Sequence, residues 1–485
     1  MSLLLATSPT TVRRPLHTTT RASQSLYLPI APPTLGSAGV VIGRELFSGK
    51  AFVYCPFSIF GDGLPGGNML VMGDTGRGKS SLNKTYALRQ ARMGRQIAVL
   101  DTKEQKESGE GEWAAVCRAL TGKDPIKFVP GGGPGSACIN PLDPAISGRR
   151  QVELVRTIVE LGLGRALDEF AGSALRIAVR RANERGEAEG RVATLPDVAY
   201  ALRHPSEQDA AAKKRTVDEL LADGLETSYV LDRLCGGTKD DVNGGGDLVG
   251  MLDGPTSLNV DLDALMIVFD LARVPSGGVA MTILMAVISV FLEEVWLRGE
   301  CECGTAPDTH QRVTTDEASG AWRRGGNPAT GCAQYNQRKR LLIFEEAWHI
   351  LGTPQLAKLL EKFLKFARGY GLSCIFIVHH LSDVDDSAET AAALKMADTI
   401  VIYSMKADEA KAVVARLGLP AWTAGHIPRL RRGVALWMVG ETVYPGVQHL
   451  LTDTEQLLCF SSNAMTEQLA PDDADAFDRE LADAA

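Results

Sequence analysis

Short apolar runs alternate with helix-compatible segments along most of the chain. Residues 68–72 form one such run, which ends at Gly73 and is followed by a helix-compatible segment after Lys79, and residues 97–100 form the next run. A strand, a helix and a second strand at this spacing make one βαβ unit, whose two strands are parallel. Further buried strands are predicted at residues 265–271, 341–344, 373–378, 398–403 and 432–439, with 432–439 as the last strand. The pattern therefore predicts an α/β fold with a doubly wound, mostly parallel sheet.

The spacing becomes helical between residues 149 and 240. Apolar residues recur there three or four positions apart, and Ala, Leu, Glu and Arg dominate, as in the series Val152, Val155, Ile158 and Val159. This periodicity predicts an all-α insertion subdomain within the α/β fold.

Two other helices are predicted in the second half of the chain. Residues 277–296 form a long helix, and residues 354–368 form an amphipathic one. The longest apolar run, roughly residues 279–292, is too short to span a bilayer and too long for a strand. We therefore expect a buried core helix there and no transmembrane segment.

The remaining segments divide the chain around these elements. Residues 1–40 contain no carboxylate and are rich in Ser, Thr and Pro, which favours a disordered arm or linker, with an organelle transit peptide as the alternative. The nucleotide-binding core is expected in two parts, residues 41–148 and 241–460. A polar, Gly-rich stretch at 299–338 predicts a mobile loop, and residues 461–485 predict an acidic tail.

Composition and charge restrict the class of protein. The formal net charge is −8, so a strongly basic nucleic-acid binder is not expected, although short basic runs occur, one of them at residues 429–432. The nine cysteines are scattered, which favours free thiols in a reducing cytoplasm. We expect a cytoplasmic protein, or one held at the inner face of the membrane by another protein.

One glycine-rich segment matches the phosphate-binding P-loop pattern in full and lies between a predicted strand and a predicted helix. Its glycines let backbone N–H groups curl around phosphates, and the helix N-terminus adds partial positive charge. Lys79 would reach the β- and γ-phosphates, and the Ser80 hydroxyl would ligate Mg²⁺. The expected nucleotide-binding residues are Gly73, Asp74, Thr75, Gly76, Arg77, Gly78, Lys79, Ser80 and Ser81.

A second candidate site element, which is acidic, follows the strand at residues 341–344. Glu345 and Glu346 stand at the end of this buried run, where a P-loop sheet presents its ligands. Glu345 would hold Mg²⁺ through water, and Glu346 would orient or deprotonate the attacking water. ATP is favoured over GTP because the sequence contains no Asn-Lys-x-Asp motif.

Several stretches resemble the ATPases of conjugative type IV secretion systems, within the HerA/FtsK-like group of P-loop pumps. They occur in the expected order over roughly residues 40–460: Gly43 to Leu46, Pro56-Phe57, the P-loop, Asn140 to Pro144, Val268 to Leu271, and Glu346-Ala347-Trp348. The resemblance implies a RecA/AAA-like P-loop fold, ATP with Mg²⁺, and a homo-hexamer with ATP sites between subunits. It also implies membrane subunits and other secretion components as partners.

The resemblance implies further catalytic residues, and the sequence departs from the family pattern at several points. Arg368 matches the arginine finger that reaches a neighbouring subunit's γ-phosphate. The metal-side acid is Glu345 where the family usually has Asp. The strand that usually ends in Thr-Gln ends here in His379-His380, and His380 is assigned the γ-phosphate sensor role. A zinc role for the two histidines, or for Cys301, Cys303, His310 and Cys332, is the alternative.

The leading hypothesis is an ATP-hydrolysing motor of a conjugative or type IV secretion-like apparatus. One alternative is a DNA translocase or coupling protein that acts directly on DNA. The other is a nucleotide-binding scaffold that hydrolyses slowly, which the unusual Glu345 and His380 motivate.

Overall fold

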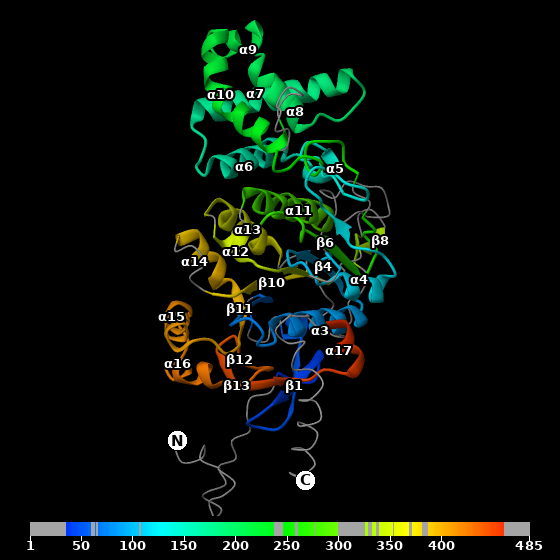
Figure 1. Cartoon of the computed structure of the whole chain (residues 1–485), viewed down its shortest axis with the longest axis vertical. Coiled ribbons are helices and arrows are strands. Elements are labelled where there is room, and N and C mark those ends of the chain that lie inside the picture. Colours follow the sequence, from blue (N-terminus) through cyan, green and yellow to red (C-terminus); the bar gives the residue numbers. More distant parts are fainter. Residues whose placement is uncertain are drawn as a thin grey trace, which may run out of the picture. The chain divides into compact units, whose positions relative to one another are not determined.

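An eleven-stranded mixed sheet forms the centre of the computed structural model (Figure 1). Every neighbouring pair from β11 to β5 is parallel, which confirms the mostly parallel α/β fold. In space the strands follow the order β2 (Ala51–Tyr54), β1 (Val40–Glu45), β13 (Thr442–His449), β12 (Val434–Val439), β11 (Ala397–Ile402), β3 (Asn68–Met72), β10 (Leu372–Val378), β9 (Arg340–Phe344), β4 (Gln96–Asp101), β6 (Met266–Asp270) and β5 (Ile126–Lys127).

The structure describes most of the chain between residues 35 and 459. The described residues are 35–59, 64, 66–105, 108–236, 246–257, 260–276, 278–298, 325–327, 332–335, 339–352, 354–367, 371–380 and 387–459. The predicted arm up to residue 34, the acidic tail and most of the predicted loop at 299–338 lie outside them, as do Arg368, Cys301, Cys303 and His310. Within the loop segment, β7 (Gly325–Asn327) and β8 (Cys332–Tyr335) pair as antiparallel strands, which the sequence did not predict.

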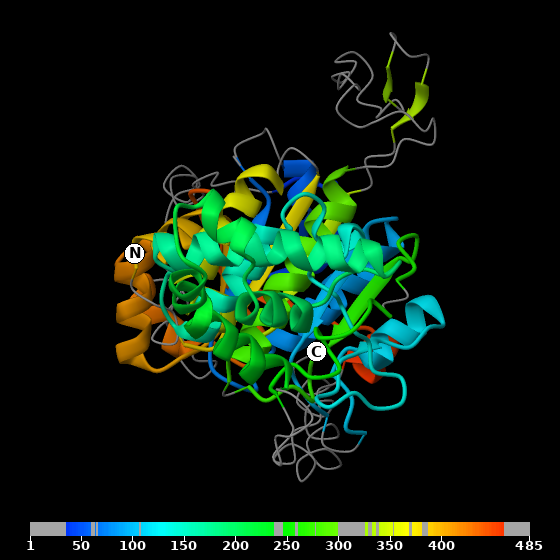
Figure 2. The ribbon, with the colours of Figure 1, turned by 90° about the horizontal axis from the view of Figure 1, so that it is seen from above.

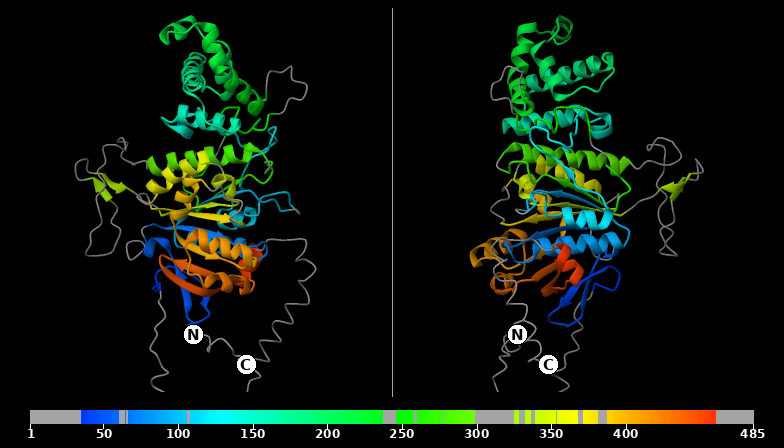
Figure 3. Two further views of the ribbon diagram at one scale, coloured as in Figure 1. Left: turned by 90° about the vertical axis from the view of Figure 1, so that its left-hand side faces the viewer. Right: turned by 45° about the vertical axis from the view of Figure 1, so that its right-hand side comes forward.

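Helices cover both faces of the parallel strands (Figures 1 and 3). On one face lie α11 (Val279–Arg298), α12 (Trp348–Leu351) and α13 (Pro354–Ala367), and on the other α3 (Lys79–Arg92) and α4 (Ala114–Thr121). Strands β3, β4, β6 and β10 are buried along their whole length. Continuous apolar runs, rather than alternating ones, are what a sheet covered on both sides requires.

Helix α11 is longer than the apolar run that predicted it. Its 18-residue stretch Val279–Trp296 has the length and composition of a membrane span, and 78% of that stretch is buried inside the protein. Its residues Met281, Ile283 and Leu284 have no exposed surface and belong to the main hydrophobic core. Burial of this extent is what a core helix shows.

Helices alone occupy the insertion between Gln151 and Cys235 in the described structure. Figure 2 looks down on this part, where α7, α8 and α10 pack against one another, while α6 contacts α11 and α13. The mostly parallel fold with an all-α insertion is thereby confirmed. The insertion comprises α6 (Gln151–Leu163), α7 (Glu169–Ala188), α8 (Leu195–Arg203), α9 (Glu207–Ala212) and α10 (Val217–Cys235).

Four antiparallel strands extend one side of the parallel sheet. Residues 432–439 do not contain the last strand, because β13 follows β12 and pairs with both β12 and β1. Pro445 and Gly446 lie inside β13, and both residue types lower the strand propensity of a sequence. The remaining short helices are α2 (Pro56–Ile59), α5 (Pro144–Ser147), α14 (Ala388–Lys395), α15 (Ala407–Leu417), α16 (Thr423–His426), η5 (Ile427–Arg429) and α17 (Asp453–Cys459).

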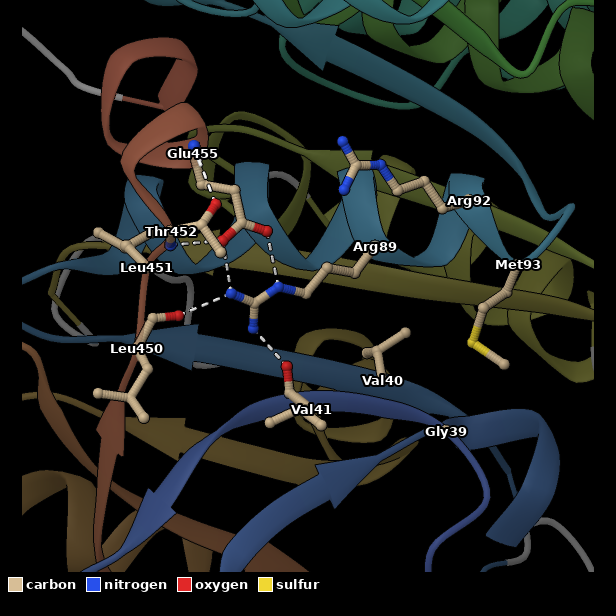
Figure 4. Close-up of a pocket in the computed structure, with 10 residues that line it drawn as sticks. All are labelled: Gly39, Val40, Val41, Arg89, Arg92, Met93, Leu450, Leu451, Thr452 and Glu455. Carbon is tan, nitrogen blue, oxygen red and sulfur yellow. Dashed lines mark hydrogen bonds and ion pairs between the residues drawn. The ribbon is translucent and has the colours of Figure 1, made fainter.

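Arg89, near the end of α3, ties this helix to the antiparallel part of the sheet (Figure 4). Its guanidinium donates to both carboxylate oxygens of Glu455, at 2.8 and 2.7 Å, and to the backbone oxygens of Leu450, at 2.7 Å, and Val41. A pocket of about 490 Å³ lies beside this contact, and Arg92 also lines it. The helix that begins at the P-loop is therefore fixed at its other end.

Candidate functional site

The P-loop connects β3 to α3 and packs closely against the end of β11. Gly73 has φ 139°, and a Cβ atom there would lie 2.6 Å from Cβ of Tyr403. Gly78 has φ 119° and is the N-cap of α3, with no side-chain capping bond. Both positions therefore require glycine, one for space and both for backbone conformation. The unsatisfied N–H groups of the first turn of α3 are available to an anion.

Lys79 is buried and points back into the loop. Its Nζ atom donates to the backbone oxygens of Gly73 and Asp74, the latter at 2.9 Å, and lies 3.1 Å from Nδ1 of His379. Burial, followed by the nearby Lys103 cation, lowers the pKa of Lys79 to about 8. An anionic ligand would stabilise the charged ammonium in this setting.

Glu345 is fully buried at the end of β9. Its Oε1 atom accepts a hydrogen bond from Nε1 of Trp113 at 3.0 Å, and its Oε2 atom has no hydrogen-bond partner in the described structure. Lys103 Nζ lies 3.9 Å from that Oε2 atom. Burial raises the pKa of Glu345, and the Lys103 charge acts in the opposite direction. A buried carboxylate oxygen without a hydrogen bond suits a cation or a water bound to one.

Glu346 adopts a backbone conformation that is unusual for a residue with a side chain, with φ 50°. Both of its carboxylate oxygens accept hydrogen bonds. Oε1 lies 2.8 Å from both Lys103 Nζ and His379 Nε2, and Oε2 lies 2.9 Å from Nε1 of Trp348. Burial acts to raise the pKa of Glu346, but the His379 hydrogen bond and the Lys103 charge hold it below its ordinary value.

His379 joins the P-loop to Glu346. Its Nδ1 atom faces Lys79, and its Nε2 atom faces Glu346. An ammonium group can only donate and a carboxylate can only accept, so a ring proton on Nε2 satisfies both the Lys79 and the Glu346 contacts. Lys103 Nζ also lies 3.3 Å from Nε2. A continuous chain of contacts therefore runs from the phosphate-binding lysine to the carboxylate expected to activate water.

His380, which the sequence assigned as the sensor, points elsewhere. Its Nδ1 atom lies 2.8 Å from Oε2 of Glu409, and 42% of its side chain is exposed. Adjacent residues at a strand end face opposite sides, so only one of the two histidines can meet the P-loop. The contacts described above place His379 against Lys79 of the P-loop and His380 against Glu409. Arg368 lies outside the described residues, and its role stays a prediction.

Sequence reasoning did not identify Lys103 as a site residue. It follows β4, which lies beside β9 in the sheet, and its ammonium reaches both glutamates. Burial acts to lower the pKa of Lys103, but the two glutamate charges raise it above its ordinary value. The available signal was the position of Lys103 three residues after the predicted strand at residues 97–100.

One of the stretches that carried the family resemblance, Asn140 to Pro144, connects structural elements. Asn140 is fully buried, donates from Nδ2 to the Ala193 carbonyl at 2.7 Å, and accepts from Leu142 N at 3.0 Å. Asp143 accepts from Ala145 N at 2.9 Å and caps α5. This stretch therefore links the sheet to the helical insertion.

The residues present fit a nucleotide with Mg²⁺. The uncapped helix N-terminus and the left-handed glycines suit phosphate oxygens. Ser80, in the first turn of α3, and the Glu345 oxygen without a hydrogen bond suit a hard cation that binds oxygen ligands. Among the described residues, no group of three or more His, Cys, Asp or Glu side chains is placed to hold a metal ion.

The fold is similar to those of solved P-loop proteins. VirB4 of Thermoanaerobacter pseudethanolicus matches with a TM-score of 0.63 and 18% identity, over 87% of this chain and 99% of that chain. The unbound bacterial conjugative coupling protein TrwBdeltaN70 matches with a TM-score of 0.50 and 12% identity, over 84% and 87%. TrwB in complex with the non-hydrolysable ATP analogue ADPNP matches with a TM-score of 0.50 and 13% identity, over 80% and 86%. These likenesses show the P-loop NTPase fold.

No family model and no curated protein sequence matches this chain.

Proposed function

We propose that this protein is an ATP-hydrolysing motor of a conjugative or type IV secretion-like apparatus. One observation carries the proposal: Lys79 of the P-loop and Glu346 at the end of β9 meet opposite nitrogens of His379. A phosphate-binding lysine coupled to a carboxylate in this way fits hydrolysis better than binding alone.

The fold supports the choice of machine. Two of the solved proteins it resembles are VirB4 and a conjugative coupling protein, and the latter was solved with an ATP analogue. The Glu346-Ala347-Trp348 segment adds support, because Trp348 Nε1 donates to Oε2 of Glu346 at 2.9 Å. The Trp348 side chain in this segment therefore holds the Glu346 carboxylate that the proposed reaction needs.

Each site residue then has a proposed role. Lys79 and the α3 N-terminus bind the phosphates. Ser80 would hold Mg²⁺ directly, and Glu345 would hold it through water. Bound Mg²⁺ would supply positive charge against the phosphate oxygens. Glu346 orients the attacking water, and His379, rather than His380, senses the terminal phosphate.

The assembly proposed with this function is a homo-hexamer in the cytoplasm, docked to membrane subunits of the apparatus. Arg368 of one subunit would then complete the site of its neighbour. Measuring the mass in solution, with and without ADPNP, tests this assembly. A strict monomer at high protein concentration with nucleotide would contradict the role of Arg368.

Steady-state ATPase assays with Mg²⁺ test the proposed activity. Lys79→Ala should lose nucleotide binding, whereas Glu346→Gln should keep binding and lose turnover by roughly 100-fold or more. His379→Ala should lower kcat more than His380→Ala. Equal, background rates for the wild type, Lys79→Ala and Glu346→Gln would contradict a motor and leave the scaffold hypothesis.

Added DNA separates the motor from a translocase that acts on DNA. Arg429, Arg431 and Arg432 are exposed, and Gly433 N donates to the Arg77 carbonyl of the P-loop at 3.0 Å, so this basic turn lies beside the nucleotide site. Stimulation of ATPase activity by DNA that weakens with salt would favour direct action on DNA. An ATPase rate that added DNA leaves unchanged at every salt concentration would exclude direct action on DNA.

A further inference from the structure

Lys103 is the cation that faces the carboxylate pair from the neighbouring strand. Glu345 N donates to the Leu100 carbonyl at 3.2 Å, so the two chains still run side by side where β4 and β9 end. Lys103 Nζ lies 2.8 Å from Oε1 of Glu346 and 3.9 Å from Oε2 of Glu345. The Lys103 side chain is 22% exposed, and that of Glu346 is 14% exposed.

We propose that Lys103 is a positioning residue for ATP hydrolysis, which holds Glu346 in place for the attacking water. The proposal rests on the proposed function. In it, Lys103 acts through Glu346 and does not itself touch the nucleotide.

The physical reason is the repulsion between two adjacent, largely buried carboxylates. Glu345 and Glu346 are consecutive residues. Glu345 is fully buried and the Glu346 side chain is 14% exposed, so little water screens the repulsion between their charges. Trp113 and Trp348 also donate to them but carry no charge, and His379 contacts Glu346 alone of the two. Lys103 is the cation whose ammonium group lies within 4 Å of both carboxylates, so its charge offsets their repulsion most directly.

Other nearby cations make their short contacts elsewhere, although the Lys84 charge also acts to lower the pKa of Glu345. Lys79 Nζ is bonded to the P-loop carbonyls and His379, and Lys84 Nζ lies 3.2 Å from Glu112 Oε2. Glu346 also has a strained backbone at φ 50°, which only surrounding contacts can maintain. Loss of the Lys103 contact would give the Glu346 side chain more freedom to move, even though Trp348 and His379 can still donate to its carboxylate.

Turnover and nucleotide binding, measured separately, test this role. Lys103→Met should lower kcat roughly 10- to 100-fold, as outer-shell substitutions do, with the dissociation constant for ADPNP within about threefold of the wild-type value. Lys103→Arg should recover most of the rate because it restores the cation. Lys127→Met is the matched control, since Lys127 pairs with Glu110 at 2.6 Å outside the site, and its kcat should equal that of the wild type.

A double-mutant cycle shows whether Lys103 acts through Glu346. Adding Lys103→Met to Glu346→Gln should cause no further loss of kcat. Independent, multiplicative losses, or wild-type turnover in Lys103→Met, would overturn the proposal. A wild-type protein that binds ADPNP without hydrolysing ATP contradicts the motor instead.

Thermal unfolding without nucleotide gives a readout that does not depend on activity. Lys103→Met should lower Tm by about 2 °C or more, and this loss should shrink when Glu346→Gln removes one carboxylate of the repelling pair. An equal loss in both backgrounds would overturn the coupling. If Lys103→Met does not fold, the double variant decides: a folded double variant supports the coupling, and an unfolded one assigns Lys103 to general stability.

Discussion

Replacement of Arg89 by methionine should destabilise the whole fold, because Arg89 joins three segments that are distant in sequence. Its side chain is 17% exposed, and that of its partner Glu455 is 3% exposed. The pair is bidentate, with N–O distances of 2.8 and 2.7 Å. Arg89→Met would leave a buried carboxylate without a counter-charge.

The size of the loss follows from these contacts. Removing one member of a buried ion pair typically costs about 3–5 kcal/mol. Glu455 keeps a hydrogen bond from Thr452 N at 2.9 Å, and water can reach the carbonyls of Val41 and Leu450. We therefore expect the lower end of the range, about 3 kcal/mol of unfolding free energy.

Urea-induced unfolding measures this loss against two other variants. Arg92→Met lies one turn away, lines the same pocket and has no ion pair among the described residues, so it should change stability by less than about 0.5 kcal/mol. Adding Glu455→Gln to Arg89→Met should recover much of the loss because no buried charge is left unpaired. The reasoning is wrong if Arg89→Met is as stable as Arg92→Met.

Three further substitutions test other contacts. Gly73→Ala should weaken ADPNP binding roughly tenfold or more, by nucleotide fluorescence titration, because its Cβ would meet Tyr403 at 2.6 Å; Gly76→Ala, which has open space, should lose less. Asn140→Ala should lower the free energy of unfolding in urea by about 2 kcal/mol, since the buried hydrogen bonds to Ala193 and Leu142 are lost. An unchanged midpoint of urea unfolding would refute the inference that Asn140 links the sheet to the helical insertion. Burial and the Arg89 charge lower the pKa of His449 to about 4, so its contribution to stability is present above pH 6.5 and is lost as pH falls from 6.5 towards 4. His449→Leu should reduce this acid sensitivity in unfolding scans.

Much of the nucleotide site could be predicted from residues that are close together in the sequence. The P-loop needs only consecutive residues, and Gly73, Gly78 and Lys79 have the conformations and burial that such a loop requires. The buried strands were visible for a similar reason, because a strand covered on both faces is apolar throughout. Strand β13 was missed because Pro445 and Gly446 interrupt its pattern.

The order of the strands in the sheet was not visible in the sequence. Lys103, Glu346 and His379 lie 243 and 33 residues apart, and they meet because β4, β9 and β10 are neighbours whose ends lie at the same edge. The choice between His379 and His380 also depends on this arrangement, since both are histidines and only the direction of each side chain separates them.

The sequence by itself determined the presence of a phosphate-binding loop, the α/β alternation and the helical insertion, because each depends on residues close together in the chain. Only the tertiary structure decided which histidine meets the P-loop and which cation faces Glu346. These side chains come from separate strands, and hydrogen bonds and charges act over a few ångströms in space whatever their distance in sequence.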